Sequence, residues 1–160
     1  MSTFREISDD ELAAHAEWLA SDGASGTKLD KTGRDLSDKA YPGLDLTKGH
    51  FIGTRFINAD FSGANFSGAD FSGARFEGTN LQGANFRGAD LSGVTLDGAN
   101  LSGADLSDAD CSGATFINAN LSNAICANID FVAANFTGAT LTGIQITGEA
   151  RLNDAIGLDV

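Results

Sequence analysis

The feature that most restricts the fold of this sequence is an apolar residue at every fifth position from Phe51 to Ile146. All 20 positions of this series, called centres below, are apolar, and most are Phe or Leu. Two residues before the centre, at the small position, 14 of the 20 residues are Ala, and Gly recurs two residues after it. On an α-helix such centres would spiral around all sides, and on a straight strand they would alternate between faces. The chain must therefore turn within each repeat.

The spacing inside one repeat indicates how the chain turns. The small position and the centre are two residues apart, so both side chains lie on one side of a short extended segment. Gly after this segment can adopt φ > 0 and form a tight turn. A turn of roughly 90° per repeat closes a coil after four repeats, and coils then stack through parallel hydrogen bonds at ~4.8 Å. Phe and Leu fill the axis, where a residue larger than Ala at the small position would overpack. We predict an all-β, four-sided solenoid.

Several repeats also carry a recognisable motif. The runs at 59–63, 64–68 and 99–103 read ADFSG, ANFSG and ANLSG. They resemble the pentapeptide-repeat family, whose motif is A-[D/N]-[L/F]-x-x, and the resemblance covers about two-thirds of the chain. It implies a right-handed quadrilateral parallel β-helix, and the handedness is taken mainly from this resemblance.

The residues before the repeats predict one capping helix over 9–22. Ser8 and Glu11 form a capping box, and Gly23 stands where a glycine commonly follows a helix. A stacked solenoid leaves its terminal coil open, so an apolar helix face is expected to cover it. The residues that we expect to pack there are Leu12, His15, Trp18 and Leu19. With Gly23 they resemble an N-terminal module, L-x-x-H-x-x-W-L-x-x-x-G, found ahead of the repeats in many bacterial pentapeptide-repeat proteins.

We divide the chain into four segments of one structural domain. Residues 1–26 form the capping helix segment, 27–50 a degenerate first coil, 51–148 the repeat β-helix, and 149–160 a closing tail. The register slips by one residue after Ile146. Apolar residues gather at this end and are candidates for cap or dimer contacts: Ile146, Leu152, Ile156 and Leu158. A homodimer through the C-terminal end is therefore a hypothesis.

Residues 20 apart stack in columns on the outside of such a coil. One column holds Asp70, Asp90, Asp110 and Asp130, and like charges in such a line repel each other. Residues 49–148 contain nine acidic residues, three arginines and no lysine. Either this acidic stripe imitates the phosphates of a nucleic acid toward a cationic protein groove, or aspartate is merely common at this position in the repeat. A second column of Asn80, Asn100 and Asn120 predicts a ladder of side-chain hydrogen bonds.

Other candidate sites are weaker. Cys111 and Cys126 are centres, so we expect small buried hydrophobic residues rather than a redox pair. His15 is expected to be a packing contact of the cap helix. His50 borders the Asp column, but a metal site with Asp70 is not expected, and the sequence predicts no cofactor.

Composition excludes several function classes. The net charge of −12 disfavours direct contact with nucleic acid or an anionic membrane. The absence of an early apolar run predicts a cytoplasmic protein without a signal peptide or membrane span. A solenoid filled by Phe, Leu and Ala has no room for a catalytic site, so we do not expect an enzyme.

Two functions remain open. The first is a rigid scaffold that binds a protein partner with a cationic surface. The second is a DNA mimic that modulates or protects a DNA-handling enzyme, with a topoisomerase such as DNA gyrase as the candidate. The resemblance implies the second in part, since some pentapeptide-repeat proteins bind gyrase. We rank the scaffold first, because the repeats here lack projecting loops and the tail is short.

Overall fold

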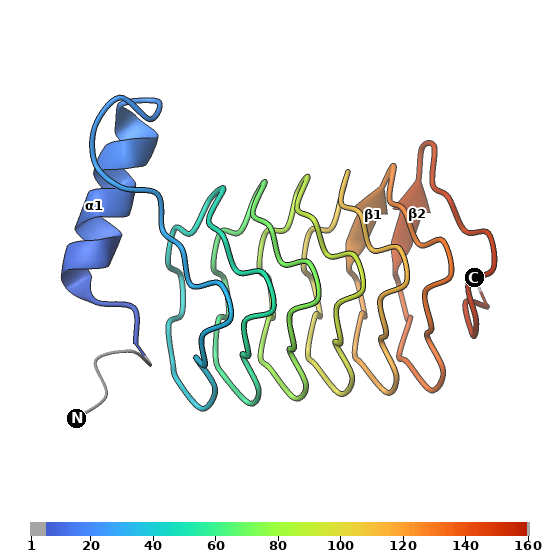
Figure 1. Ribbon diagram of the computed structural model, residues 1–160. Helices are drawn as coiled ribbons and strands as arrows, with labels where there is room; N and C mark the ends of the chain where they lie inside the picture. Colours follow the sequence, from blue (N-terminus) through green and yellow to red (C-terminus); the bar gives the residue numbers. More distant parts are fainter. Residues whose placement is uncertain (1–5, 160) are drawn as a thin grey trace.

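The structure is a computed structural model and describes residues 6–159 of the chain. Helix α1 (Asp9–Ala20) comes first, and strands β1 (Ile125–Ala127) and β2 (Gln145–Thr147) follow near the other end. Figure 1 shows a row of stacked coils with α1 lying across the N-terminal end and the C-terminus at the opposite end. The molecule is therefore a short rod with a helix across one end only.

Parallel pairing between residues 20 positions apart builds the rod. It begins with Asp30 opposite His50 and continues to Asn120 opposite Thr140 without a change of register. Four repeats of five residues account for this spacing, so the predicted four-sided coil is confirmed. The degenerate first coil, 27–50, makes the same backbone pairing as the regular coils, through Asp30, Asp35, Ala40 and Asp45.

The paired segments are shorter than ordinary strands. On most sides only the residue before the centre pairs with its counterpart, because the turn begins directly after the centre. In one such turn the N–H of Ala64 donates to the C=O of Phe61 at 3.1 Å, and Gly63 between them has a φ of 66°. This is the pattern of a type II turn, which needs φ > 0 at its third residue. Gly is therefore used for its backbone freedom at this position.

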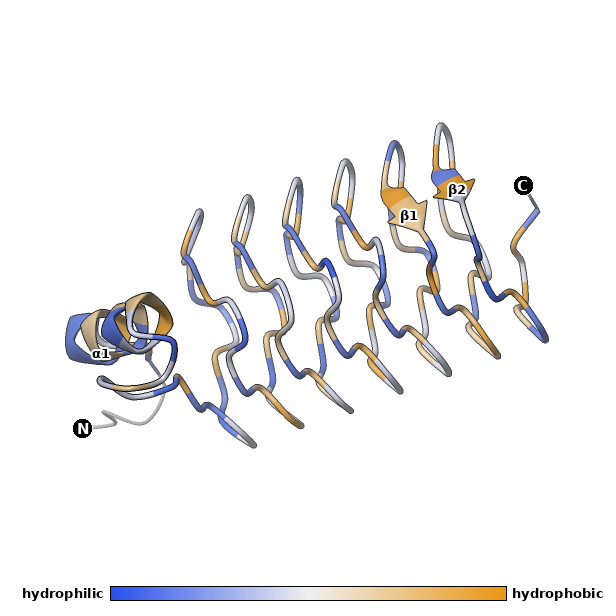
Figure 2. Ribbon diagram, turned by 90° about the horizontal axis from the view of Figure 1, so that it is seen from above, coloured by the Kyte–Doolittle hydropathy of each residue, from blue (hydrophilic) through white to orange (hydrophobic). Residues whose placement is uncertain are grey.

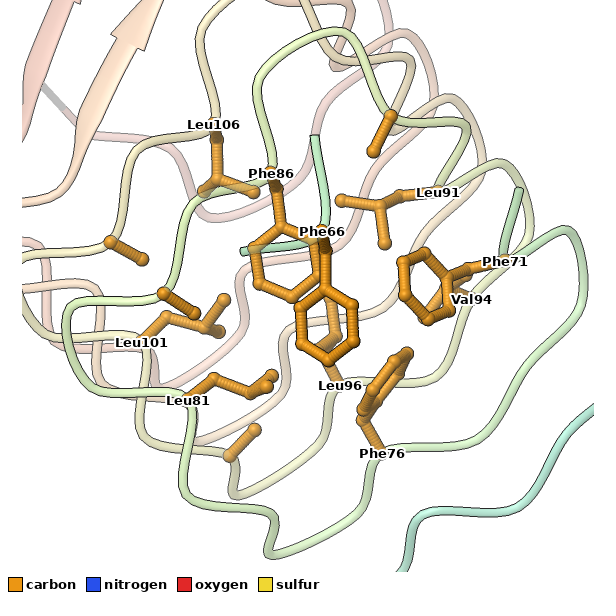
Figure 3. Packing of buried hydrophobic residues seen from close by; sticks show 14 of the residues in the cluster. Phe66, Phe71, Phe76, Leu81, Phe86, Leu91, Val94, Leu96, Leu101 and Leu106 are labelled. Carbon is orange, nitrogen blue, oxygen red and sulfur yellow. The ribbon is translucent and has the colours of Figure 1, made fainter. Parts of the chain in front are cut away.

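Centre residues fill the interior of the rod. Figure 3 shows Phe66, Phe71, Phe76 and Phe86 pointing toward a common axis. Rings of successive coils stack along this axis, as for Phe56 and Phe76, whose centroids lie 4.5 Å apart with planes 4° from parallel. The small-position alanines from 59 to 134 are buried around the rings. Figure 2 shows hydrophobic and hydrophilic residues alternating along the coils, so each side buries one set and exposes the other.

Helix α1 begins as predicted. The Ser8 hydroxyl accepts a hydrogen bond from the N–H of Glu11 at 3.2 Å, and the Glu11 carboxylate accepts one from the N–H of Ser8 at 2.9 Å. This reciprocal pair is the expected capping box. It satisfies two backbone donors that an uncapped helix end would leave without partners.

The end of α1 differs from the prediction by two residues. The helix ends at Ala20 rather than at residue 22, and Asp22, not Gly23, takes the first left-handed position, with a φ of 52°. The N–H of Gly23 then donates to the C=O of Trp18 at 2.8 Å. Aspartate tolerates the left-handed region better than most residues, so it can end the helix one residue before the glycine.

The N-terminal segment is attached to the first coil by polar contacts that the apolar pattern did not indicate. Lys31 stands in a centre register and is only 5% exposed. Its ammonium donates to both carboxylate oxygens of Glu11 and to the C=O of Glu6, each at 2.7 Å. Close by, the N–H of the buried Ile7 donates to the Tyr41 hydroxyl at 3.0 Å. A charged centre is tolerated here because α1 supplies its counter-charge.

The tail continues the rod for about half a coil. Asp130 pairs with Arg151, and Asn135 with Ile156, both 21 positions apart. One extra residue therefore lies between Thr147 and Arg151, which is the register slip expected from the sequence. The tail covers two of the four sides of the last full coil. In the described part of the chain, the other two sides of this coil have no further coil stacked on them.

Candidate interaction surfaces

The structure places the four aspartates of the acidic stripe in one column. Successive parallel pairs run through His50, Asp70, Asp90, Asp110, Asp130 and Arg151. Arg151 forms an ion pair with Asp130 at the C-terminal end of this column. The stripe therefore consists of four carboxylates in a line, with a histidine at one end and an arginine at the other.

Each of these carboxylates also supports the turn that follows it. Oδ1 of Asp70 accepts hydrogen bonds from the N–H and the hydroxyl of Ser72 at 3.0 and 2.5 Å. Asp90 accepts the same pair of bonds from its own following serine. Asp110 and Asp130 accept a backbone N–H two residues later, each at 2.9 Å. These are Asx turns, in which one side-chain oxygen replaces a backbone acceptor.

Asparagine performs this turn function on other sides of the rod. Oδ1 of Asn100 accepts the N–H of Ser102 at 3.1 Å, and Oδ1 of Asn120 accepts the N–H of Ser122 at 3.0 Å. The turn therefore needs an oxygen but not a charge. Nothing in the local geometry requires aspartate in place of asparagine in the acidic stripe.

The predicted asparagine ladder is confirmed, and it starts on an aspartate. Asn80 Nδ2 donates to Asp60 Oδ1 at 3.1 Å, and Asn100 donates to Asn80 and Asn120 to Asn100 at 3.4 Å. The backbone N–H and the hydroxyl of Ser62, together with the Asn80 amide, lower the pKa of Asp60 against a smaller opposing effect of burial. This side of the rod is a hydrogen-bonded and nearly uncharged surface.

The apolar residues of the C-terminal end differ in exposure. Ile146 and Leu158 are half-buried against the core, whereas Leu152 is 37% and Ile156 58% exposed. A cavity of about 590 Å³ opens at the same end and is lined in part by Leu141. This end therefore presents apolar surface that no described segment covers.

The predicted cap residues lie between α1 and the first coil. His15 is 1% exposed, and Leu12, Trp18 and Leu19 are half-buried. A second cavity, of about 370 Å³, lies beside α1 and is lined in part by Lys28. The apolar pattern of the sequence does not indicate Lys28 or Lys31, although Lys31 lies five residues before Leu36 and thus continues the series of centres.

Both cysteines are buried, as expected of centre residues. Burial raises the pKa of Cys111 well above the usual range of a thiol, and it raises the pKa of Cys126 to about 12. Thiolates are the reactive form of cysteine, so neither residue has the properties of a nucleophile. Within residues 6–159, no group of three or more His, Cys, Asp or Glu could hold a metal ion.

In the part of the chain that the structure describes, no helix is both long enough and apolar enough to cross a membrane.

The coil geometry defines a class of protein: a four-sided solenoid with a filled interior, which can contact other molecules only through its outer sides and ends. The chain belongs to the pentapeptide repeat family. The model of this family, described as pentapeptide repeats (8 copies), matches residues 43–78, 69–108, 84–123 and 109–148. Members of this family fold as right-handed quadrilateral β-helices.

Solved structures of the same family show limited similarity to this chain. A pentapeptide repeat protein from Nostoc PCC 7120 is 22% identical over 84% of this chain and 93% of its own, with a TM-score of 0.49. One from the Arabidopsis thaliana thylakoid lumen is 35% identical over 62% of this chain and 63% of its own, with a TM-score of 0.35. A trypsin-treated form of QnrB1, a plasmid-mediated fluoroquinolone resistance protein, is 23% identical over 81% and 68%, with a TM-score of 0.41. No curated protein sequence matches the chain.

Proposed function

We propose that this chain is a non-enzymatic, right-handed rod that binds a protein partner through its acidic stripe, Asp70, Asp90, Asp110 and Asp130. The observation that supports the proposal is that asparagine makes the same turn elsewhere in the rod. Four carboxylates at a spacing of ~4.8 Å repel one another and cost stability that asparagine would not. A binding role explains why the charges are present.

The charge pattern indicates the chemistry of the partner. Between Asp70 and Asp130 the outward column carries no basic residue, and Arg151 forms an ion pair with Asp130 at its C-terminal end. A surface rich in Lys or Arg would be attracted to such a line, and association would weaken as salt screens the charges. We therefore infer a cationic protein surface, and direct contact with nucleic acid is disfavoured.

A stripe variant tests this proposal. Changing Asp70, Asp90, Asp110 and Asp130 together to Asn keeps the Asx turns and removes four charges. We expect unfolding stability to stay equal or rise slightly, while capture of the partner from a native extract is lost. The control removes four charges elsewhere, through Glu17→Gln, Glu149→Gln, Asp154→Asn and Asp159→Asn, and should retain the partner. Equal capture by both variants would refute a role for the stripe.

The alternative function is imitation of DNA toward a topoisomerase. A line of carboxylates on a slim rod resembles the charge of a phosphate backbone, so gyrase supercoiling is the assay to use. Inhibition or protection by the wild type, absent from the stripe variant and present in the control variant, would favour the DNA mimic. No effect of any of the three proteins would exclude gyrase and leave the scaffold.

We also propose that two chains associate through the C-terminal end. The exposed Leu152 and Ile156, together with the two sides that end the stack, support this arrangement. Light scattering at increasing concentration should give a dimer mass for the wild type and a monomer mass for Ile156→Asp with Leu152→Glu. A monomer mass for the wild type at the highest concentration would exclude the dimer.

A further inference from the structure

Both histidines of the chain lie where α1 meets the first coil. His15 is on α1, and His50 is the last residue of that coil and pairs with Asp30 near its beginning. Each receives a hydrogen bond from the short segment 27–30, which connects α1 to the rod. The chain contains no other histidine, so all of its imidazole groups act on this one connection.

His15 holds the connecting segment as a neutral acceptor. The backbone N–H of Leu29 donates to His15 Nδ1 at 3.0 Å, so this nitrogen carries no proton. The proton is therefore on Nε2, which is buried without a hydrogen-bond partner. Protonation would turn Nδ1 into a donor facing another donor. It would break the bond to Leu29 and leave a charge in a buried position.

His50 also acts as a neutral acceptor. Its Nε2 lies 2.7 Å from the Lys28 ammonium, which has donors but no acceptor. A proton on this nitrogen would place two cations in contact. Lys28 is held at the same time over the ring of Trp18, with its Nζ 5.4 Å from the ring centroid. Loss of the His50 contact would therefore loosen the connection to α1 through Trp18 as well.

The surroundings of His15 shift its pKa in opposite directions. Burial lowers the pKa of His15, and the Lys28 ammonium adds to this effect. The Thr47 backbone and the Asp45 carboxylate favour the charged form, but Thr47 lies outside hydrogen-bonding geometry with Nε2. None of these groups can replace the acceptor that Leu29 would lose.

His50 has a comparable mixture of neighbours. The Lys28 ammonium contacts its ring, while Asp30 and Asp70 are its partners in the parallel pairing of the coils. Hydrogen bonds from the Thr32 backbone N–H and hydroxyl lower the pKa of Asp30 against the opposing effect of burial, so this carboxylate is still charged in weak acid. It can attract a protonated His50 away from Lys28 but cannot restore their hydrogen bond.

The other attachments of the cap do not depend on histidine. Lys31 binds Glu11 and the C=O of Glu6, and Ile7 binds Tyr41. Burial alone would raise the pKa of Glu11, but hydrogen bonds from Lys31 and Ser8 outweigh it, and the net pKa is lowered. These contacts therefore persist at a pH where histidine is already protonated.

We propose that protonation of His15 and His50 is a pH-sensitive release that frees the C-terminal half of α1 and segment 27–30 from the first coil. The Lys31–Glu11 contact keeps the N-terminal half in place and acts as the hinge. Because burial lowers the folded pKa of His15, its neutral ring stabilises the closed form fully above the unfolded pKa of histidine, about 6.5. That contribution declines as the pH falls from there toward the folded pKa.

Trp18 reports on this release because it is the only tryptophan and its ring stacks on His15, with centroids 5.9 Å apart. Its emission is followed from pH 8 to pH 5 in the full chain. The matched variant carries His15→Asn and His50→Gln, which place an oxygen near the position of each acceptor nitrogen but do not titrate. We expect an emission change in the wild type and a flat profile in the variant, while far-UV circular dichroism of both stays constant.

Hydrogen exchange gives a second readout. Loss of one hydrogen bond should speed exchange of the Leu29 amide by about tenfold after correction for intrinsic pH dependence. This acceleration should share its midpoint with the ring-proton NMR titration of His15 in the wild type. The proposal is overturned if the variant shows the same emission change, or if Leu29 exchange and the His15 titration have different midpoints. The wild-type comparison decides the matter even if the variant fails to fold.

Discussion

Replacing Phe71 by alanine is expected to lower the free energy of unfolding by about 3–5 kcal/mol. Phe71 stacks on Phe51 with centroids 4.9 Å apart and meets the rings of Phe56, Phe66 and Phe76 edge to face. The alanine variant would leave a void in place of the Phe71 ring. This void cannot collapse easily, because backbone hydrogen bonds fix the coils on both sides of it. Urea unfolding followed by circular dichroism measures the loss.

Phe71→Leu is the matched control for this substitution. Leu91 occupies the next centre along the same column, one coil further on, so this side of the interior accommodates leucine. We expect a loss below about 1.5 kcal/mol for this variant. Similar stability of the alanine and leucine variants would mean that the aromatic column is not tightly packed.

The position of Phe71 also predicts where the structure opens. The aromatic residues form two groups, one from Phe51 to Phe86 and another from Phe116 to Phe136, with Leu and Cys centres between them. In a repeat protein each coil contacts mainly its neighbours. Hydrogen exchange in Phe71→Ala should therefore accelerate first in the N-terminal coils.

Replacing Gly26 by alanine is expected to detach the connecting segment from α1, with a loss of about 2 kcal/mol or more. Gly26 has a φ of 77°, and an added Cβ would overlap the backbone C=O of Ala14 and lie 2.5 Å from the backbone N of Trp18. Backbone atoms of a helix cannot move aside as a flexible side chain could. Trp18 emission and thermal unfolding measure the effect.

Gly33→Ala separates strain in the backbone from this steric overlap. Gly33 has a similar φ of 66°, but an added Cβ would have no neighbour within 4 Å. Gly33→Ala should lower the free energy of unfolding by only about 1 kcal/mol, the penalty of an alanine in the left-handed region. Ala133 already adopts such a conformation, with a φ of 57°. Equal effects of the two substitutions would show that Gly26 is needed for its φ alone.

Much of the fold could be predicted because the period of five admits few solutions. An apolar centre, a small residue and a turn glycine repeat with little variation, so the pattern that closes one coil also stacks the next. The N-terminal helix and the asparagine ladder were predictable for a similar reason, since both depend on residues close in sequence or in one column. The stripe aspartates could be aligned in the same way, but their use could not be decided from spacing.

The cap shows where prediction from the pattern fails. Lys31 stands in a centre register, but a search for apolar centres passes over a lysine. Gly26 lies outside the motif that ends at Gly23, and its close contact with α1 arises only when the chain turns back on the helix. Asp22 likewise replaces Gly23 at the end of the helix, because local propensities differ by too little to fix one position.

The sequence by itself therefore determined the coil, its four sides, its filled interior and the alignment of its outer columns, because these follow from short-range periodicity. Only the tertiary structure decided how α1 is fastened to the rod and how far the tail covers its end. Those features depend on single contacts between segments that share no repeat, such as His15 with Leu29 and Lys31 with Glu11. A periodic pattern cannot encode such contacts, because each occurs once.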